Sequence, residues 1–332
     1  MTAAGAGHGA PRDRLVIAVT GATGFVGRQL LADGARAGHR MVAVTRSPDA
    51  IGEVEARGIT DLDDRDGLSR ALAGADAVVH LAARVHVMHH EGPEALDRFR
   101  AVNVRGTRHL LEAARDVGVG RVVLLSTAKV LGEGARGELL RDTAAPAPVG
   151  AYATSKAEME SLLDEPALAP RQWAVLRPPL VHGPGVGGNF RRLLQLADLG
   201  ARIPLPFGGV RNARSLVGVR NLADAILCVL TDARAHGGRF LVSDGEDPST
   251  ADLLLRLGRA LGRRVRLVNV PPLALQAGLR LIGRGAEAER LLGSFRVEAS
   301  ALRTAIGWRP PLSVDAGLED VAAWWCERGG GR

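Results

Sequence analysis

The segment Arg14-Leu-Val-Ile-Ala-Val-Thr-Gly-Ala-Thr-Gly-Phe-Val-Gly27 decides the fold of this 332-residue chain. Its first half is an apolar run typical of a buried strand, and a helical pattern over Phe25–Ala37 begins among three glycines. Gly21 permits a tight turn, Gly24 lets the backbone approach a pyrophosphate, and Gly27 lets the helix pack closely on the strand. Three glycines alone would be weak evidence in a chain with 42 of them. Their position between a strand and a helix predicts a dinucleotide-binding loop, with the anion at the helix N-terminus.

Apolar, β-branched runs alternate with helical patterns through the rest of the first half. We expect strands at 41–45, 76–80, 121–126 and 173–177, and helices at about 93–117 and 149–163. The alternation predicts an α/β fold, a doubly wound parallel Rossmann sheet with right-handed crossovers. Such a sheet binds its ligands at the carboxyl ends of its strands.

The composition changes after Arg177, where proline and glycine crowd residues 177–188 and 203–209. This change indicates a smaller C-terminal substrate-binding lobe. The expected division is 1–13 as a flexible tail, 14–177 plus about 212–244 as the NAD(P)-binding Rossmann domain, and 178–211 with 245–328 as the lobe.

Two further expectations concern the second half of the chain. Strands at about 214–217 and 239–242 are expected to return to the sheet, which would make the lobe discontinuous. The segment Pro271–Leu292 is amphipathic, and we interpret it as a helix that covers the lobe rather than as a lipid contact.

Composition and charge exclude several classes of function. The 43 basic residues are scattered along the chain, only 3% of residues are aromatic, and the net charge of +7 therefore favours anionic small ligands over nucleic acid. No stretch approaches the roughly 20 apolar residues of a membrane-spanning helix. Cys228 and Cys326 lack the spacing of a zinc site and are expected to be reduced thiols of a cytoplasmic protein. His86, His89 and His90 indicate a solvated loop rather than a metal site.

Thr127, Tyr152 and Lys156 form the strongest catalytic signal. Tyr152 is the only tyrosine, and Lys156, one of only two lysines, follows it by one helical turn on the same face. A free tyrosine is a poor acid–base group at neutral pH, but the ammonium of Lys156 and a positively charged nicotinamide ring would both favour its phenolate. Thr127 lies at the end of the fifth strand, where its hydroxyl would share a substrate oxygen with Tyr152.

These residues together resemble the extended short-chain dehydrogenase/reductases of the NAD-dependent epimerase/dehydratase family, from Arg14 to about Trp308. The landmarks are 20–27, Asp61-Leu62, 80–83, Asn103, Ser126-Thr127, 152–156 and 177–179. Within the family, the segments 79–88, 187–190, 214–217 and 242–246 resemble bacterial UDP-glucose 4-epimerase-like proteins of polysaccharide biosynthesis. That branch also contains reductases of UDP-4-keto-6-deoxy sugars.

The resemblance implies an NAD(P)(H) cofactor held by residues that follow the strands. They are Gly21, Thr23, Gly24, Phe25, Val26, Gly27, Arg46, Asp61, Leu62, Leu81, Ala82, Ala83, Asn103, Lys156 and Pro179. Arg46 stands at the end of the second strand, where an acidic residue would bind ribose hydroxyls and an arginine can pair with a 2′-phosphate. We therefore favour NADP(H) over NAD(H), although a solvated Arg46 would leave the choice open.

The resemblance also implies a UDP-sugar or related sugar diphosphate as substrate and a homodimer, through the helices near 93–117 and 149–163. Its substrate-binding residues would be Ser126, Asn189, Arg214 and Arg290. Arginine suits this role because it can bind phosphate with two parallel hydrogen bonds. The sugar and its carrier, UDP or a lipid diphosphate, stay open.

The residues after Thr127 narrow the reaction. Dehydratases of this superfamily carry an Asp-Glu pair there, whereas this chain has Ala128 and Lys129. Hydride transfer at C4 remains, with Tyr152 as base when a hydroxyl is oxidised and as acid when a keto group is reduced. We expect a nucleotide-sugar 4-epimerase; the alternatives are an NADPH-dependent reductase of a UDP-4-keto-6-deoxy sugar and a non-catalytic Rossmann binding or sensor protein.

Overall fold

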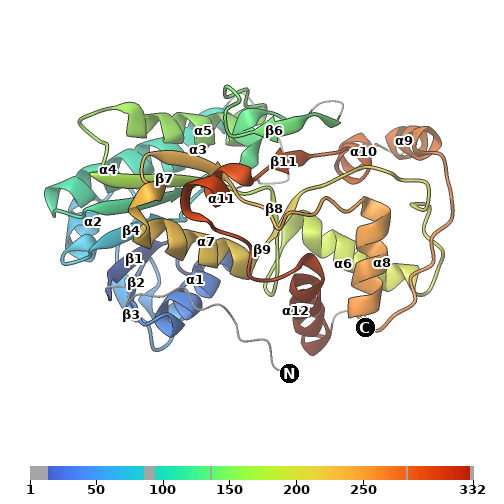
Figure 1. Cartoon of the computed structure of the whole chain (residues 1–332), viewed down its shortest axis with the longest axis horizontal. Coiled ribbons are helices and arrows are strands. Elements are labelled where there is room, and N and C mark those ends of the chain that lie inside the picture. The colour runs from blue at the N-terminus through green and yellow to red at the C-terminus, as the bar shows by residue number, and fades with distance from the viewer. Residues whose placement is uncertain (1–13, 86–93, 135–136, 282, 330–332) are drawn as a thin grey trace.

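The structure, a computed structural model, describes residues 14–85, 94–134, 137–281 and 283–329 (Figure 1). The tail over 1–13 and the histidines at 86, 89 and 90 lie outside the described residues.

Seven parallel strands form the central sheet, in the order β10-β7-β5-β4-β1-β2-β3 (Figure 1). Their bounds are β1 Val16–Thr20, β2 Arg40–Thr45, β3 Glu55–Gly58, β4 Ala77–His80, β5 Arg121–Leu125, β7 Gln172–Arg177 and β10 Gly238–Leu241. The order runs outward from β1 in both directions, so that crossovers cover both faces. The predicted doubly wound Rossmann fold is confirmed.

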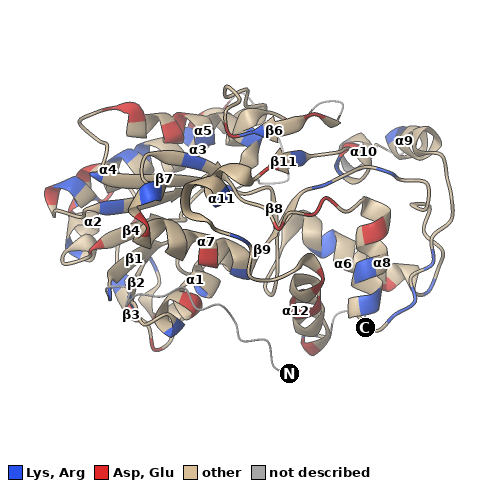
Figure 2. Cartoon of the chain, viewed as in Figure 1, with Lys and Arg blue, Asp and Glu red and all other residues tan. Residues whose placement is uncertain are grey.

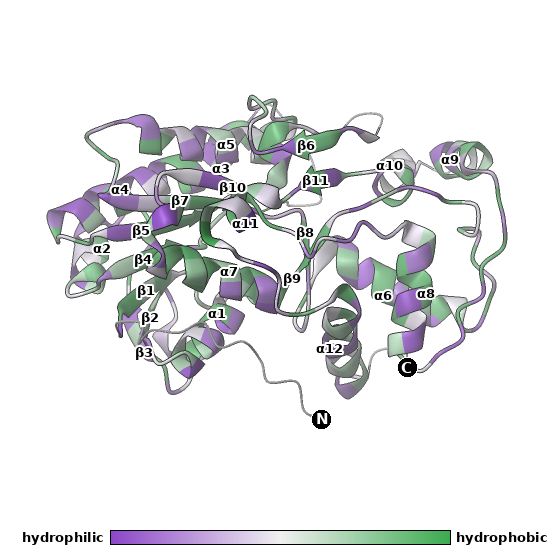
Figure 3. Ribbon diagram, viewed as in Figure 1, coloured by the Kyte–Doolittle hydropathy of each residue, from purple (hydrophilic) through white to green (hydrophobic). Residues whose placement is uncertain are grey.

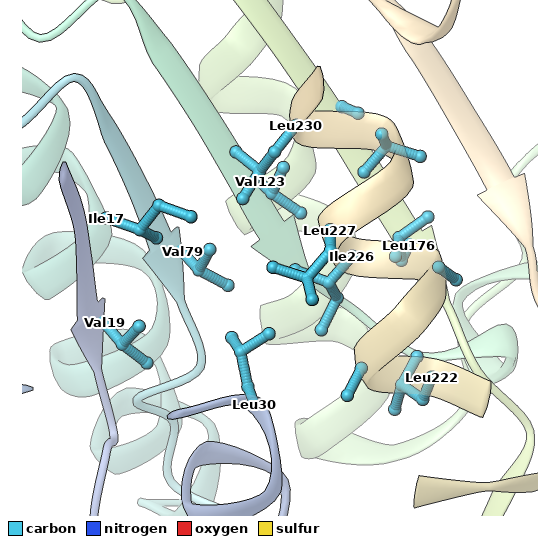
Figure 4. Close-up of a cluster of buried hydrophobic side chains, with 14 of the residues drawn as sticks. Ile17, Val19, Leu30, Val79, Val123, Leu176, Leu222, Ile226, Leu227 and Leu230 are labelled. Atoms are coloured by element: carbon cyan, nitrogen blue, oxygen red, sulfur yellow. The ribbon is translucent and has the colours of Figure 1, made fainter. Parts of the chain in front are cut away.

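Helices cover both faces because successive strand residues point to opposite sides of the sheet. Ile17 and Val19 face α1 (Phe25–Arg36) and α7 (Val219–Thr231), whose leucines complete one cluster (Figure 4). Ala18 and its neighbours on the other face pack against α2 (Arg65–Leu72), α4 (Gly106–Asp116) and α5 (Gly150–Ser161). The inner strands β1 and β4 are mostly apolar and buried, as expected of a sheet covered on both faces (Figure 3).

Residues 95–116 form one continuous helical stretch with a change of pitch. It begins with α3 (Ala95–Arg100), passes through a π-helical turn at Ala101–Arg105, and continues as α4. The predicted helices near 93–117 and 149–163 are therefore both present. A π-helical turn inside a helix often marks a functional site.

Two short parallel pairs lie outside the central sheet. β8 (Leu180–His182) pairs with β9 (Leu216–Gly218), and β6 (Leu139–Arg141) pairs with β11 (Arg296–Glu298). The expectation that the strand at about 214–217 joins the sheet is therefore wrong, whereas the strand at 239–242 does join it as β10. The reason is that β10 occupies the sheet edge beside β7, which leaves β9 to pair with the segment that follows Pro178 and Pro179.

A separate cluster holds the C-terminal elements together. It is built from α6 (Gly188–Gly200), α8 (Thr250–Ala260) and α12 (Val314–Glu327), with Phe190 at its centre. Next to it lie α9 (Pro272–Leu281) and α10 (Gly285–Leu292), while α11 (Ser300–Ile306) returns to the first cluster.

The segment 271–292 forms two helices, and both contact the cluster, as the covering interpretation expects. α10 buries Ala288 and packs Leu291 and Leu292 against the cluster. α9 packs Leu275 against it but has no fully buried residue. Among the described helices, none is long and apolar enough to cross a bilayer.

Candidate active site

The turn between β1 and α1 is shaped by steric constraints at its glycines. Gly21 has a φ of 69°, and an added Cβ would lie 2.6 Å from the backbone nitrogen of Ala82. A Cβ on Gly27 would lie 2.3 Å from the carbonyl oxygen of Gly21. The N–H of Gly24 donates to that same oxygen at 2.9 Å, which closes the turn. α1 begins at Phe25 and Val26, and Thr23 lies in the turn before it. The N–H groups of the first helical turn lie where a pyrophosphate would bind, and the turn fits a dinucleotide.

The carboxyl ends of β2 and β3 lie at the same end of the parallel sheet as this turn. Arg46 follows β2 directly and is exposed. Asp61 follows β3, and its Oδ1 accepts from the backbone N–H groups of Asp63 and Asp64 at 2.8 and 3.1 Å. The side chain of Leu62 packs against Gly106 at the start of α4. All three predicted cofactor residues therefore follow the carboxyl ends of β2 and β3.

Asn103 holds the segment after β4 in place from within the π-helical turn. It is fully buried, its Oδ1 accepts from the N–H of Arg84 at 2.8 Å, and its Nδ2 donates to the carbonyl oxygen of Arg84 at 3.1 Å. Nδ2 also donates to Ser155 Oγ at 2.9 Å, and Ser155 donates to the carbonyl oxygen of Tyr152 at 2.8 Å. The backbone of Arg84, directly after Leu81–Ala83, and the helix that carries Tyr152 are thus joined through one amide.

A hydrogen-bond chain that sequence analysis did not find continues from Asn103 to the first strand. Thr107 Oγ1 donates to the carbonyl oxygen of Asn103 at 2.7 Å, and His80 joins Thr107 through Nε2 at 3.0 Å and Thr20 through Nδ1 at 2.7 Å. Since Thr107 uses its hydrogen on Asn103, His80 Nε2–H donates to Thr107 and Nδ1 accepts from Thr20. Burial, with the charge of Lys156, lowers the pKa of His80 to about 3, so that it is neutral at neutral pH.

Tyr152 and Lys156 stand on α5, facing the end of β5. Lys156 is buried, and its Nζ donates to the carbonyl oxygen of Leu125 at 2.7 Å and to Met159 Sδ at 3.5 Å. The Tyr152 ring makes an edge contact with Phe99, with ring centroids 6.0 Å apart. The Arg84 guanidinium lies 5.7 Å from the Phe99 ring centroid. The sequence analysis did not predict a role for Arg84 or Phe99 at this site.

Burial shifts the two ionisable groups of this pair in opposite directions. It raises the pKa of Tyr152 to about 12 and lowers that of Lys156 to about 8, the latter against the effect of Glu160. Tyr152 is therefore a neutral phenol at neutral pH in the protein alone. The phenolate expected from the sequence requires additional positive charge, and an oxidised nicotinamide ring would supply it.

The loop after β5 presents two hydroxyl groups beside this pair. Ser126 Oγ is buried and has no hydrogen-bond partner among the described residues, which is the state expected of a group that binds a ligand. Thr127 is also buried and accepts from the N–H of Lys129 at 3.4 Å. Ala128 is buried, and its N–H donates to the carbonyl oxygen of Pro178 at 2.9 Å, beside Pro179.

Lys129, the second lysine of the chain, is held by an acidic residue. Its Nζ lies 2.8 Å from Glu133 Oε1, and nearly half of its side chain is exposed. The two positions after Thr127 thus carry an apolar residue and a paired cation, in place of an acid–base pair.

The predicted substrate residues lie on the C-terminal elements. Arg214 Nη1 donates to the carbonyl oxygens of Arg290 and Gly293, at 2.6 and 2.9 Å, so that the two arginine segments are adjacent. Burial lowers the pKa of Arg214, and Glu133 opposes this shift. Asn189 is exposed in the first turn of α6. The two hydrogen bonds of the Arg214 guanidinium go to a different element, the C-terminal end of α10.

A model of the NAD-dependent epimerase/dehydratase family matches residues 17–243, which contain the glycine turn, Thr127, Tyr152 and Lys156. The chain belongs to this family. It is therefore an NAD-dependent enzyme of the extended short-chain dehydrogenase/reductase type, as the resemblance predicted.

Two relatives show the range of this family. A UDP-glucose 4-epimerase of Vibrio cholerae is 35% identical over 315 residues, covering 92% of this chain and 94% of that protein. A 3-diazoavenalumate denitrifying reductase of a Streptomyces species is 30% identical over 312 residues, covering 89% and 95%. The solved structure of Thermus thermophilus UDP-glucose 4-epimerase in complex with NAD is 25% identical, with a TM-score of 0.73 over 94% of this chain and 99% of that one.

Proposed function

We propose that this enzyme is a nucleotide-sugar 4-epimerase that acts on a UDP-hexose or UDP-N-acetylhexosamine. One observation carries the proposal. Tyr152 and the buried Lys156 lie at the carboxyl end of β5, next to the unpartnered hydroxyl of Ser126. The glycine turn follows β1 at the same end of the parallel sheet. The similarity to the Vibrio cholerae 4-epimerase over nearly the whole chain supports the choice of reaction. When bound, the cofactor would accept a hydride from C4 of the sugar and return it.

In this proposal Tyr152 takes the proton of the C4 hydroxyl and later gives it back, while Ser126 and Thr127 share the same oxygen. Lys156 lowers the cost of the tyrosine phenolate through its charge. The arginines 214 and 290, with Asn189, bind the diphosphate, since charged donors suit phosphate oxygens.

The positions after Thr127 support hydride transfer without elimination. Removing water from a sugar needs an additional acid and base next to the reacting carbons. Ala128 is apolar and buried, and Lys129 is paired with Glu133. Neither offers a carboxyl group, so we do not propose a dehydratase.

A second candidate, an NADPH-dependent reductase of a UDP-4-keto-6-deoxy sugar, is favoured by Arg46. The guanidinium is exposed at the end of β2, where a 2′-phosphate would lie. The 30% identity with the Streptomyces reductase also supports reduction chemistry in a chain of this length. The same Tyr152 would then act only as an acid.

The experiment that separates the two candidates starts from the purified protein. It is denatured, any released cofactor is identified, and the native protein is tested with UDP-glucose and UDP-N-acetylglucosamine without added cofactor. Retained stoichiometric cofactor together with epimerisation supports the first candidate. A protein that releases no cofactor and consumes NADPH only with a 4-keto sugar supports the second and contradicts the first.

We also propose a homodimer formed through α3, α4 and α5. These helices lie together on one face of the sheet (Figure 1). Light scattering of the full chain tests this, with a monomeric mass as the contradicting result.

A further inference from the structure

α9 presents an apolar face to solvent. Leu273 is 80% exposed and Leu281 is 88% exposed, the largest values among the exposed large hydrophobic residues of the described chain. Leu273, Ala277 and Leu281 are four residues apart, so that they lie on one side of the helix, and all three are exposed. Leu275, on the opposite side, is half-buried against the C-terminal cluster. The helix is thus docked by one face and leaves a second apolar face uncovered.

This face lies at one end of the molecule. Figure 1 places α9 at the far end of the long axis from α2, with α10 between it and the rest of the chain. Exposed leucines that gather on one helix face mark an interaction surface, whereas single exposed ones are ordinary.

The segment that contains α9 carries charges of one sign. Arginines occur along the whole chain, but the 34 residues from Leu253 to Ala286 contain seven of them and no Asp or Glu. Those seven charges equal the formal net charge of +7 of the entire protein. Arg256 and Arg263 form ion pairs with acidic residues of other segments.

The other five arginines of this stretch are exposed. They are Arg259, Arg264, Arg266, Arg280 and Arg284. Figure 2 shows basic residues on α8, on the loop that follows it and on α9. Arg280 lies on α9 itself, at the border of the apolar face, and Arg284 follows the helix directly.

We propose that α9 and these five arginines form a surface that binds an anionic lipid bilayer. An apolar helix face would enter the boundary between headgroups and acyl chains, and arginines beside it would bind phosphate headgroups. An apolar protein partner would explain the leucines but not the absence of every carboxylate over 34 residues. The combination matches a negatively charged membrane.

The position of α9 gives this surface a consequence for the substrate. α9 packs against α10, and the carbonyl oxygen of Arg290 on α10 accepts from Arg214. A membrane bound at α9 would therefore lie beside the arginine pair assigned to the diphosphate. Membrane binding does not depend on that assignment, and each is tested without the other.

The test uses the full chain and sedimentation with lipid vesicles. Vesicles of phosphatidylcholine with about a quarter phosphatidylglycerol should bind the protein, and vesicles of phosphatidylcholine alone should bind it much less. The variant Leu273→Gln/Leu281→Gln should reduce partitioning about tenfold or more. Arg280→Gln should reduce it about fivefold, because each basic residue near an anionic surface contributes by that order.

Two variants serve as controls. Val149→Gln replaces an exposed apolar residue at the start of α5, and Arg36→Gln replaces an exposed arginine on α1; both should bind vesicles like the wild type. Glutamine is a good helix former, and circular dichroism of each variant checks that the fold is kept. Conversion of UDP-sugar in solution should be equal in the wild type, the double leucine variant, Arg280→Gln and Arg36→Gln.

Three results would overturn the proposal: no binding to anionic vesicles, equal binding by the double leucine variant, or an equal loss in the controls. A change of oligomeric state in the double leucine variant, without vesicle binding by the wild type, would assign the surface to self-association instead.

Discussion

The ammonium of Lys156 lies 2.7 Å from the carbonyl oxygen of Leu125 and ties α5 to the end of β5. Because Leu125 directly precedes Ser126 and Thr127, this bond sets the register between the helix that carries Tyr152 and the loop that carries the two hydroxyls. The lysine is almost fully buried, at 2% exposure, so its place admits little variation.

Lys156 should not be replaceable by arginine. The planar guanidinium is larger and cannot keep a single donor on Leu125 in a slot of this size. We expect Lys156→Arg to lose activity at least a hundredfold despite its charge, and Lys156→Met to lose as much while keeping the fold, since it removes a buried charge. Steady-state kinetics and thermal unfolding of both variants check this. Wild-type kcat in Lys156→Arg would show that charge alone suffices.

Alanine substitution in the β1–α1 turn should destabilise the protein most where the added Cβ comes closest to backbone atoms. Gly27→Ala should lower the free energy of unfolding by about 1–3 kcal/mol, because its Cβ meets backbone atoms at 2.3 and 2.8 Å. Gly120→Ala is the matched control, since Gly120 also has ordinary φ and has open space around it. That variant should be neutral or gain up to about 1 kcal/mol. Urea denaturation measures both; equal effects would contradict the tight-turn geometry.

His80 should make the protein sensitive to acid. Its folded pKa, about 3, is below the ordinary value of 6.5, so the unfolded chain binds more protons between these values. The stability that His80 contributes is present above pH 6.5 and is lost as pH falls toward 3, amounting to about 2 kcal/mol between pH 7 and pH 5. A His80→Gln variant should show a correspondingly smaller loss in urea titrations at these two pH values. An unchanged loss would place the acid sensitivity elsewhere.

Arg46 should decide the preference between the two nicotinamide cofactors. If its guanidinium binds a 2′-phosphate, Arg46→Ala raises the Kd for NADPH by about tenfold to a hundredfold, the value of a charged hydrogen bond. The Kd for NADH should not change, which makes NADH the internal control in a fluorescence titration. Tighter binding of NADH than NADPH by the wild type would show that Arg46 is a solvated residue.

The parts of this protein that sequence predicts are those with a local pattern. The strand and glycine turn at 14–27 and the four-residue spacing of Tyr152 and Lys156 are legible because one segment carries the whole signal. The hydrogen-bond chain through His80 and Thr107 is different, since its partners are separated by 27 residues or more and meet only once the parallel strands pair. Nothing in the local sequence marks Thr107.

Burial of an apolar helix is also decided by its surroundings. The pattern of α9 predicts an amphipathic helix correctly, but the same pattern suits a helix covering the lobe and one facing outward. Only the filled cluster of α6, α8 and α12 shows that Leu273 is left outside. Similarly, the sequence predicts the strand β9 but not its pairing with β8. That pairing follows from the position of β10 beside β7 in the central sheet.

The most direct test of the central claim follows the hydrogen at C4. UDP-glucose and UDP-N-acetylglucosamine carrying deuterium at C4 are incubated in ordinary water, without added cofactor, with the wild type and with Tyr152→Phe. The account predicts that the wild type forms the C4 epimer with its deuterium retained at C4, and that Tyr152→Phe loses activity by about a hundredfold or more while remaining folded. Loss of the deuterium to solvent, or undiminished turnover by Tyr152→Phe, would contradict it.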